Sequence, residues 1–255
     1  MTASTQSYDE LARYYDQIFE DWDASIERQA LVLSAMLRRQ SARNRAIRVL
    51  DCACGIGTQS LGLAKQGFHV VGCDISPAAV ERARLEAVKR GLDVRFCVAD
   101  MRQLTDVEGS NFDAVICIDN ALPHLDSDDQ LLRAAQQAHG KLRPGGSFIT
   151  SIRDYDRLIV ERPLAQGPSF YSDDHGRRIV FQIWDWLDER HYRFHLYITS
   201  TVQAGWQTFH FTSIYRAVLR NELRDLLIQA GFENVSWRSP SESSFYQPIC
   251  IAQRS

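Results

Sequence analysis

The first half of the chain alternates short apolar runs with amphipathic stretches. The apolar runs have the length and composition of buried strands, and the stretches between them carry apolar residues at helical spacing. Ser76 and Pro77 mark the N-cap and first position of one helix, and Pro144-Gly145-Gly146 predicts a turn. The predicted strands are Arg48–Cys54, His69–Ile75, Val94–Ala99, Phe112–Asp119 and Ser147–Arg153, and the predicted helices are Thr58–Gln66, Pro77–Arg90 and Asp128–Leu142.

After Arg153 the spacing of apolar residues changes from that of a helix to every second residue. Apolar and aromatic residues alternate with polar ones along Tyr192–Val202, a pattern typical of antiparallel strands. A helix is then predicted to stop at Gly231, followed by a closing hairpin. The remaining predicted elements are the strands Arg178–Asp188 and Trp206–Tyr215, the helix Asn221–Ala230, and the hairpin strands Glu233–Trp237 and Pro248–Gln253.

These patterns predict an α/β fold. Strand and helix alternation with crossovers of this length favours a Rossmann-like, doubly wound, seven-stranded, mostly parallel sheet with helices on both faces. We divide the chain into an N-terminal helical cap (1–45), a core (46–160), an antiparallel β insertion (161–216) and a C-terminal part of the core (217–255). The insertion either covers the mouth of a site or serves stability or homodimerisation, because its strands must bury an apolar face.

Composition narrows the class of protein. The chain has 255 residues, 45% of them hydrophobic, and a formal net charge of -3. The absence of a basic excess argues against a nucleic-acid partner. Met1–Asp9 lacks an apolar segment, and no apolar run is long enough for a membrane span, so we expect a cytoplasmic protein. The six cysteines lack metal-ligand spacing and are expected to pack as small hydrophobic residues without a metal.

The segment from Val49 to Thr58 carries the most specific chemistry. Asp51 ends an apolar run just ahead of Gly55 and Gly57, and Asp74 ends the next run. Glycines here allow a tight turn and close approach of a ligand. A carboxylate ahead of the turn would repel a pyrophosphate but attract the ammonium and sulfonium groups of S-adenosylmethionine. Asp74 is placed to bind ribose hydroxyls.

The ordered blocks Val49–Thr58, Val71–Pro77, Val98–Met101, Phe112–Leu125 and Leu142–Tyr155 resemble the motifs of class I S-adenosylmethionine-dependent methyltransferases. Within that family, Asp119–Leu125 and Ile152–Asp156 resemble motifs of glycine and sarcosine N-methyltransferases, although those enzymes usually carry Gly-Asn-Ser where this chain has Asp119-Asn120-Ala121. The resemblance implies that residues 46–160 are an S-adenosylmethionine-binding core.

The resemblance also implies roles for individual residues in binding this cofactor. The turn after the first strand would hold the methionine end, the ends of the second and third strands the ribose and adenine, and the backbone of Ile118 would lie beside the sulfonium. Tyr15, Trp22 and Arg28 of the cap would enclose the methionine carboxylate and methyl group, with core packing or an exposed charge as the alternative for each. The full set is Tyr15, Trp22, Arg28, Asp51, Ala53, Gly55, Gly57, Asp74, Ile75, Asp100, Met101 and Ile118.

Methyl transfer needs a nucleophile placed behind the methyl group and shielded from water, so no catalytic triad is required. Asn120 is a candidate to bind an acceptor amine, and Arg153 with Tyr155 to anchor a carboxylate. His124 is a candidate base if its pKa lies near neutral, with helix packing as the alternative. Tyr171 is a candidate residue of the substrate lid.

The expected function is N-methylation of a small nitrogen-containing metabolite, and two acceptor classes remain open. One is a glycine- or sarcosine-like amine. The other is a planar nitrogen heterocycle, such as the azapteridines of toxoflavin-type pathways, held by aromatic residues of the insertion: Trp184, Trp186, Tyr197, Trp206, Phe209 and Phe211. The alternatives are a non-catalytic S-adenosylmethionine-binding protein, an O-methyltransferase, or a nucleic-acid methyltransferase; the last lacks the residues that hold a flipped base.

Overall fold

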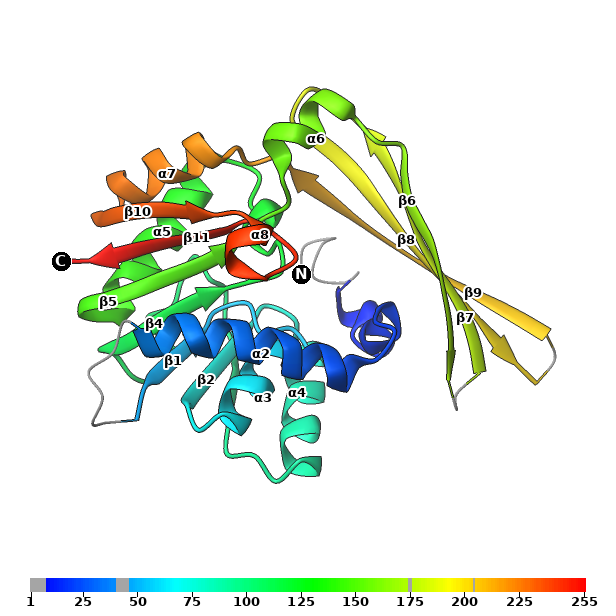
Figure 1. The fold of residues 1–255 in the computed structure, drawn as a ribbon, viewed down its shortest axis with the longest axis horizontal. Helices are drawn as coiled ribbons and strands as arrows, with labels where there is room; N and C mark the ends of the chain where they lie inside the picture. Colours follow the sequence, from blue (N-terminus) through cyan, green and yellow to red (C-terminus); the bar gives the residue numbers. More distant parts are fainter. Residues whose placement is uncertain (1–7, 40–45, 174–175, 204) are drawn as a thin grey trace.

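The computed structural model describes residues 8–39, 46–173, 176–203 and 205–255. Within them, one sheet has the strand order β10-β11-β5-β4-β1-β2-β3 (Figure 1). Only β11 runs antiparallel to its neighbours. The predicted seven-stranded, mostly parallel sheet is therefore confirmed. Its strands are β1 (Arg48–Asp51), β2 (His69–Asp74), β3 (Arg95–Val98), β4 (Phe112–Cys117), β5 (Leu142–Ser151), β10 (Phe232–Arg238) and β11 (Ile249–Arg254).

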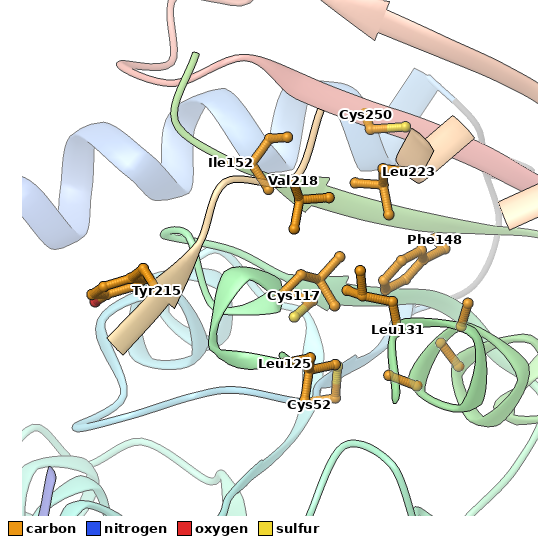
Figure 2. Close-up of a cluster of buried hydrophobic side chains, with 14 of the residues drawn as sticks. Cys52, Cys117, Leu125, Leu131, Phe148, Ile152, Tyr215, Val218, Leu223 and Cys250 are labelled. Atoms are coloured by element: carbon orange, nitrogen blue, oxygen red, sulfur yellow. The ribbon is translucent and has the colours of Figure 1, made fainter. Parts of the chain in front are cut away.

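Alternate residues of the central strands enter two separate apolar layers. Val49 and Ala114 pack with α2, whereas Leu50 and Val115 pack with α5 and α7, because successive side chains of a strand point to opposite faces. Figure 2 shows the second layer, in which cysteines pack among leucine and phenylalanine side chains. The helices are α2 (Trp22–Arg39), α3 (Thr58–Lys65) and α4 (Pro77–Lys89) on the first side, and α5 (Asp128–Lys141) and α7 (Arg220–Gln229) on the second.

The cysteines behave as predicted. All six are free; Cys97 is half-buried and the other five are buried. One local prediction is wrong: Pro144–Gly146 does not form a turn between helix and strand. Strand β5 begins at Leu142 and passes through these residues, with an irregular register against β4 between Phe112 and Ala114.

A second sheet stands apart from the first and is joined to it through α6 (Tyr155–Glu161) (Figure 1). Its antiparallel strands have the order β6-β7-β8-β9. Three of them were predicted. The first was missed because Gly167 and Pro168 interrupt its pattern, at a register shift between Gln166 and Ser169. The strands are β6 (Ala165–Asp173), β7 (Gly176–Trp186), β8 (His191–Val202) and β9 (Gly205–Arg216).

The N-terminal segment lies between the two sheets. It includes the short helix η1 (Tyr15–Ile18) and leads into α2. Asp9 accepts hydrogen bonds from the Ser76 hydroxyl and the Ala78 backbone N–H at the start of α4. Residues 1–7 and 40–45 of the predicted cap lie outside the described residues.

Two further short helices follow strands of the main sheet, η2 (Leu122–His124) after β4 and α8 (Pro240–Ser243) between β10 and β11. Among the helices that the structure describes, none is long and apolar enough to cross a membrane.

Candidate active site

The turn after β1 has the geometry that its glycines predict. Gly57 has φ = 96°, and a Cβ there would lie 3.2 Å from the Leu61 side chain, so a larger residue would be strained in both backbone and packing. The Gly55 N–H donates to Asp74 Oδ2 over 2.9 Å and ties the turn to the end of β2. Asp51, Ala53, Gly55 and Gly57 are thus brought together with Asp74 at the carboxyl ends of β1 and β2.

Asp51 is a buried carboxylate, 1% exposed. It accepts hydrogen bonds from the Ser60 hydroxyl (2.7 Å) and, at the limit of such contacts, from the Ala53 N–H (3.5 Å). Burial raises its pKa to about 7. Among the described residues no basic side chain lies within ion-pair distance of it. A buried acid without a cation favours a positively charged ligand, which fits S-adenosylmethionine.

The other predicted cofactor residues lie along the same sheet edge. Asp74 accepts the backbone N–H groups of Gly55 and Ser76, each over 2.9 Å, and burial raises its pKa. Ile75 follows it and is 40% exposed. Asp100 is held by the Arg102 guanidinium, which lies within 3.0 Å of both carboxylate oxygens, and Met101 follows it. Ile118 is buried after β4.

A cavity of about 990 Å³ lies where the carboxyl ends of β4 and β5 face the second sheet. Its walls come from the N-terminal segment, α2, α6, β6 to β9 and the segment from Pro240 to Pro248. The cavity brings together five predicted site residues, namely Tyr15, Arg28, Asn120, Arg153 and Tyr171. Its size is at the upper end of the range for small-molecule sites.

Arg153 lies in an aromatic enclosure built by the second sheet. Its guanidinium carbon lies 4.7 Å from the ring centre of Trp184 and 5.1 Å from that of Phe194, and Nη1 donates to the Tyr192 hydroxyl over 2.7 Å. Among the described residues no carboxylate is ion-paired with it, since Asp154 and Asp156 both bind Arg220. The guanidinium remains available to an anionic group in the cavity.

One prediction beside Arg153 needs correction. Tyr155 is fully buried and does not line the cavity, so it cannot anchor a ligand carboxylate. Its hydroxyl instead accepts from Asn120 Nδ2 and contacts the Tyr192 hydroxyl, each over 3.0 Å. Asn120 also accepts the Arg153 backbone N–H over 3.0 Å. Its side chain therefore holds the loops after β4 and β5 together before any acceptor arrives.

His124 does not have the predicted character of a base. Its Nε2 lies 2.6 Å from the Tyr8 hydroxyl and its Nδ1 lies 3.4 Å from the Ser213 hydroxyl. Burial and the charge of Arg153 lower its pKa to about 3. A ring that stays neutral and is hydrogen-bonded on both nitrogens packs the N-terminal segment against β9, in line with the packing alternative.

Trp22 lies beside the glycine turn rather than in the cavity wall. Its Nε1 donates to the Thr58 hydroxyl over 2.9 Å, at the start of α3. Tyr171 does line the cavity, and the Arg178 guanidinium lies 5.2 Å from the centre of its ring.

The predicted aromatic slot for a planar ring does not form as expected. Of its six residues only Trp184 and Phe211 line the cavity. Tyr197 stacks on Phe181 and His210, and Trp206 is 49% exposed near the end of the second sheet. Strand alternation places Tyr197 and Trp206 on the outer face of the sheet. Trp186 and Phe209 share the inner face with Trp184 and Phe211, but their rings pack against Tyr192 and Tyr14 instead of lining the cavity.

Asp119 is a cavity residue to which the sequence assigned no role. Asp119 and Asn120 have φ values of 62° and 63°, two successive left-handed residues. The Asp119 carboxylate accepts hydrogen bonds from Tyr15 (3.2 Å) and from Tyr246, one phenol on each oxygen. The only sequence signal was an acid at the end of β4, and nothing marked Tyr246.

Comparisons with known proteins agree with this geometry. Residues 49–146 match the family model described as a methyltransferase domain. The chain is 36% identical over 140 residues to a glycine/sarcosine N-methyltransferase of Parasynechococcus marenigrum, covering 54% of this chain and 48% of that protein. It is 25% identical over 236 residues to a glycine/sarcosine N-methyltransferase of Aphanothece halophytica, covering 92% and 85%. The match thus spans about half the length of the first relative.

Two solved structures share the whole architecture. The sugar N-methyltransferase KedS8 from Streptoalloteichus superposes with a TM-score of 0.76 at 18% identity, covering 94% of this chain and 92% of that one. CalS10, an amino pentose methyltransferase from Micromonospora echinaspora solved with S-adenosylmethionine bound, gives 0.73 at 22% identity, covering 91% and 92%. At these identities the likeness establishes the fold.

Proposed function

We propose that this chain, in which residues 49–146 match a methyltransferase domain, transfers the methyl group of S-adenosylmethionine to the nitrogen of a small amine. The observation that carries the proposal is the Arg153 guanidinium, which lines a large cavity next to the cofactor-binding strand ends and has no ion-pair partner among the described residues. A fork of N–H donors enclosed by aromatic rings suits a carboxylate or another anionic group of the acceptor. The names of the two glycine/sarcosine relatives support transfer to nitrogen.

Cavity volume bears on the size of the acceptor. The cavity of about 990 Å³ is lined by Tyr15 and Arg28, which are expected on the cofactor, as well as by Arg153, so its volume is shared between cofactor and acceptor. An amine with a larger body than glycine still fits, and the names of KedS8 and CalS10 suggest an amino sugar as one such acceptor to test. For a planar heterocycle, only Trp184 and Phe211 of the expected slot reach the cavity, although other rings such as Phe181 and Phe194 also line it.

The residues around the cavity have separate tasks in this proposal. S-adenosylmethionine, when bound, supplies an electrophilic methyl group on a positively charged sulfur. The Asp51 carboxylate compensates the positive charge at the methionine end. Arg153 orients the acceptor through its anionic group, while the N-terminal segment and the second sheet keep water from the reacting atoms. Asn120 and Tyr155 hold Arg153 in place.

The test is a screen with radiolabelled S-adenosylmethionine and product identification by mass spectrometry. The acceptors are glycine, sarcosine, a nucleotide-linked amino sugar, an azapteridine, and the hydroxyl counterpart of the amino sugar. We expect label on nitrogen. Label on oxygen only, or no label with any acceptor, would overturn the proposal in favour of an O-methyltransferase or a non-catalytic binding protein.

The variant Arg153→Lys tests the assigned anchor in the same assay. Lysine keeps the charge but lacks the planar fork, so KM for the acceptor should rise at least tenfold while S-adenosylhomocysteine binds as before. Arg224→Lys, on the exposed side of α7, is the control and should change neither value.

A further inference from the structure

We propose that Asp119 is the residue that binds the acceptor's amino group. The inference rests on the proposed transfer to nitrogen and names the group that receives it. Asp119 lines the cavity after β4, one residue beyond Ile118, which is expected beside the cofactor sulfur. At this position its carboxylate lies between the cofactor-binding strand ends and the acceptor cavity.

The charge balance of the cavity singles out this carboxylate. Asp154 and Glu161 also line the cavity, but Asp154 is paired with Arg220 over 2.8 Å and Glu161 with Arg157 over 3.4 Å. In the part of the chain that the structure describes, Asp119 has no ion-pair partner, and its hydrogen-bond donors are the neutral phenols of Tyr15 and Tyr246. A half-buried carboxylate held only by neutral donors attracts a positively charged or N–H-bearing ligand group.

The two phenols stay protonated, so both can donate a hydrogen bond to Asp119. Burial and the nearby Asp119 charge raise the pKa of Tyr15, and the Asp119 charge raises the pKa of the more exposed Tyr246. Tyr15 comes from the N-terminal segment, and Tyr246 lies 54% exposed in the segment after α8. Two elements far apart in the sequence therefore clamp one carboxylate and fix its direction, while two phenols leave further lone pairs on its oxygens.

The backbone at Asp119 adopts a strained conformation that places its carboxylate. Successive left-handed residues at Asp119 and Asn120 are strained, and two backbone hydrogen bonds that Ser151 accepts stabilise them. The Asp119 N–H donates to Ser151 Oγ over 2.8 Å, and the Asn120 N–H donates to Ser151 O over 3.1 Å. Ser151 Oγ in turn donates to Gln247 Oε1 over 2.8 Å, in the same segment as Tyr246. Backbone strain that surrounding hydrogen bonds maintain is typical of residues at ligand-binding sites.

The methyl transfer can take place with the acceptor nitrogen next to the Asp119 carboxylate. The acceptor amine binds as the free base and donates one N–H to Asp119, having left its extra proton in water. The N–C bond forms as the C–S bond breaks, and the electron pair of the broken bond stays on sulfur. The positive charge passes to nitrogen, beside the carboxylate that lowers the energy of the developing charge. The methylated ammonium loses its proton to water after release.

The test uses Asp119→Asn, because asparagine tolerates the left-handed backbone and still accepts a phenol hydrogen bond. The protein, saturated with S-adenosylhomocysteine, is titrated by calorimetry with cyclohexylamine and with its neutral isostere cyclohexanol. Cyclohexylamine should bind at least tenfold more weakly to Asp119→Asn than to the wild type, with cyclohexanol and S-adenosylhomocysteine unchanged. Asp225→Asn, an exposed acid of α7, should behave as the wild type.

Two results would overturn the assignment. One is equal or absent binding of cyclohexylamine in the wild type and Asp119→Asn. The other is loss of S-adenosylhomocysteine binding in Asp119→Asn, which would place the residue in the cofactor site. Because the titration needs no turnover, a failed acceptor screen with a positive titration would refute the proposed function and leave the amine site standing.

Discussion

At the scale of single residues, Asp51 carries the proposed selection of a positively charged cofactor. It is buried, it lacks a cation among the described residues, and its pKa is raised to about 7. An acid with a raised folded-state pKa stabilises the fold least when it is ionised, so the free protein should lose stability as pH rises from about 4 through 7. The cofactor's positive charge would reverse this effect when bound.

Asp51→Asn tests this balance without the cofactor. Asparagine is neutral and can keep the Ser60 hydrogen bond, so the variant should be more stable than the wild type at pH 8, by at most about 4 kcal/mol. At pH 5 the difference should be less than half as large, because most of the cost of ionising Asp51 arises between pH 5 and 7. Urea unfolding at both pH values measures it; a variant less stable than the wild type at pH 8 would contradict the assigned burial cost.

The positions of site residues could be predicted where the residues lie in short segments, and not where their partners are distant in the sequence. Asp51, the glycines and Asp74 lie in two short segments, and strand-end geometry brings them together. Tyr155 and His124 were assigned wrongly because their partners, Tyr192 and Tyr8, lie 37 and 116 positions away. A motif does not reveal which of its polar residues become buried against such partners.

At the scale of elements, the contact between α2 and α3 holds the cap to the core. A Cβ at Gly62 would lie 2.7 Å from Ala30 Cβ and 2.8 Å from the Ile26 carbonyl oxygen, so the two helices touch through this glycine. Gly62→Ala should destabilise the protein by about 1–3 kcal/mol, because the helices must separate.

Gly140→Ala in α5 is the matched control for Gly62→Ala. A Cβ there meets nothing within 4 Å, so the same change should stabilise the protein by up to about 1 kcal/mol through helix propensity. Thermal unfolding of both variants decides; equal effects would show that the helix contact is looser than described.

Helices and strands with a regular hydrophobic period could be predicted from the sequence, whereas one irregular edge strand could not. The parallel strands were predicted from short apolar runs, and the three long antiparallel strands from the alternation of apolar and polar residues. Strand β6 carries Gly167 and Pro168, and most of its residues are exposed. Such an edge strand lacks the apolar alternation that identifies a buried one.

At the scale of the whole molecule, Arg178 makes three of the hydrogen bonds that hold the N-terminal segment to the second sheet. Arg178 of β7 donates to the carbonyl oxygens of Gln17 (3.0 Å), Phe19 (2.7 Å) and Glu20 (2.9 Å). Arg178→Met should release the segment, so that amide hydrogen exchange over residues 14–20 becomes at least tenfold faster.

Arg177→Met is the control for that experiment. Arg177 precedes Arg178 in β7, and its guanidinium lies 5.4 Å from the ring centre of Trp206, away from the segment. Exchange over residues 14–20 should match the wild type. Equal protection in Arg178→Met and Arg177→Met would mean that other contacts close the cavity.

The role of the insertion is also a question at this scale. Its inner face lines the cavity through Trp184, Phe194 and Phe211. This apolar face is therefore occupied within one chain. The homodimer expected through the insertion stays a prediction, and sedimentation equilibrium separates a species of 29.1 kDa from one of twice that mass.

The most direct test of the account is a calorimetric titration of S-adenosylmethionine and of NAD at pH 8, on the wild type and on Asp51→Asn. We expect the wild type to bind S-adenosylmethionine and ignore NAD, and the variant to bind S-adenosylmethionine at least tenfold more weakly. Binding of NAD in preference to S-adenosylmethionine, or an unchanged affinity in Asp51→Asn, would contradict the claim that a buried carboxylate ahead of the glycine turn selects a cationic methyl donor.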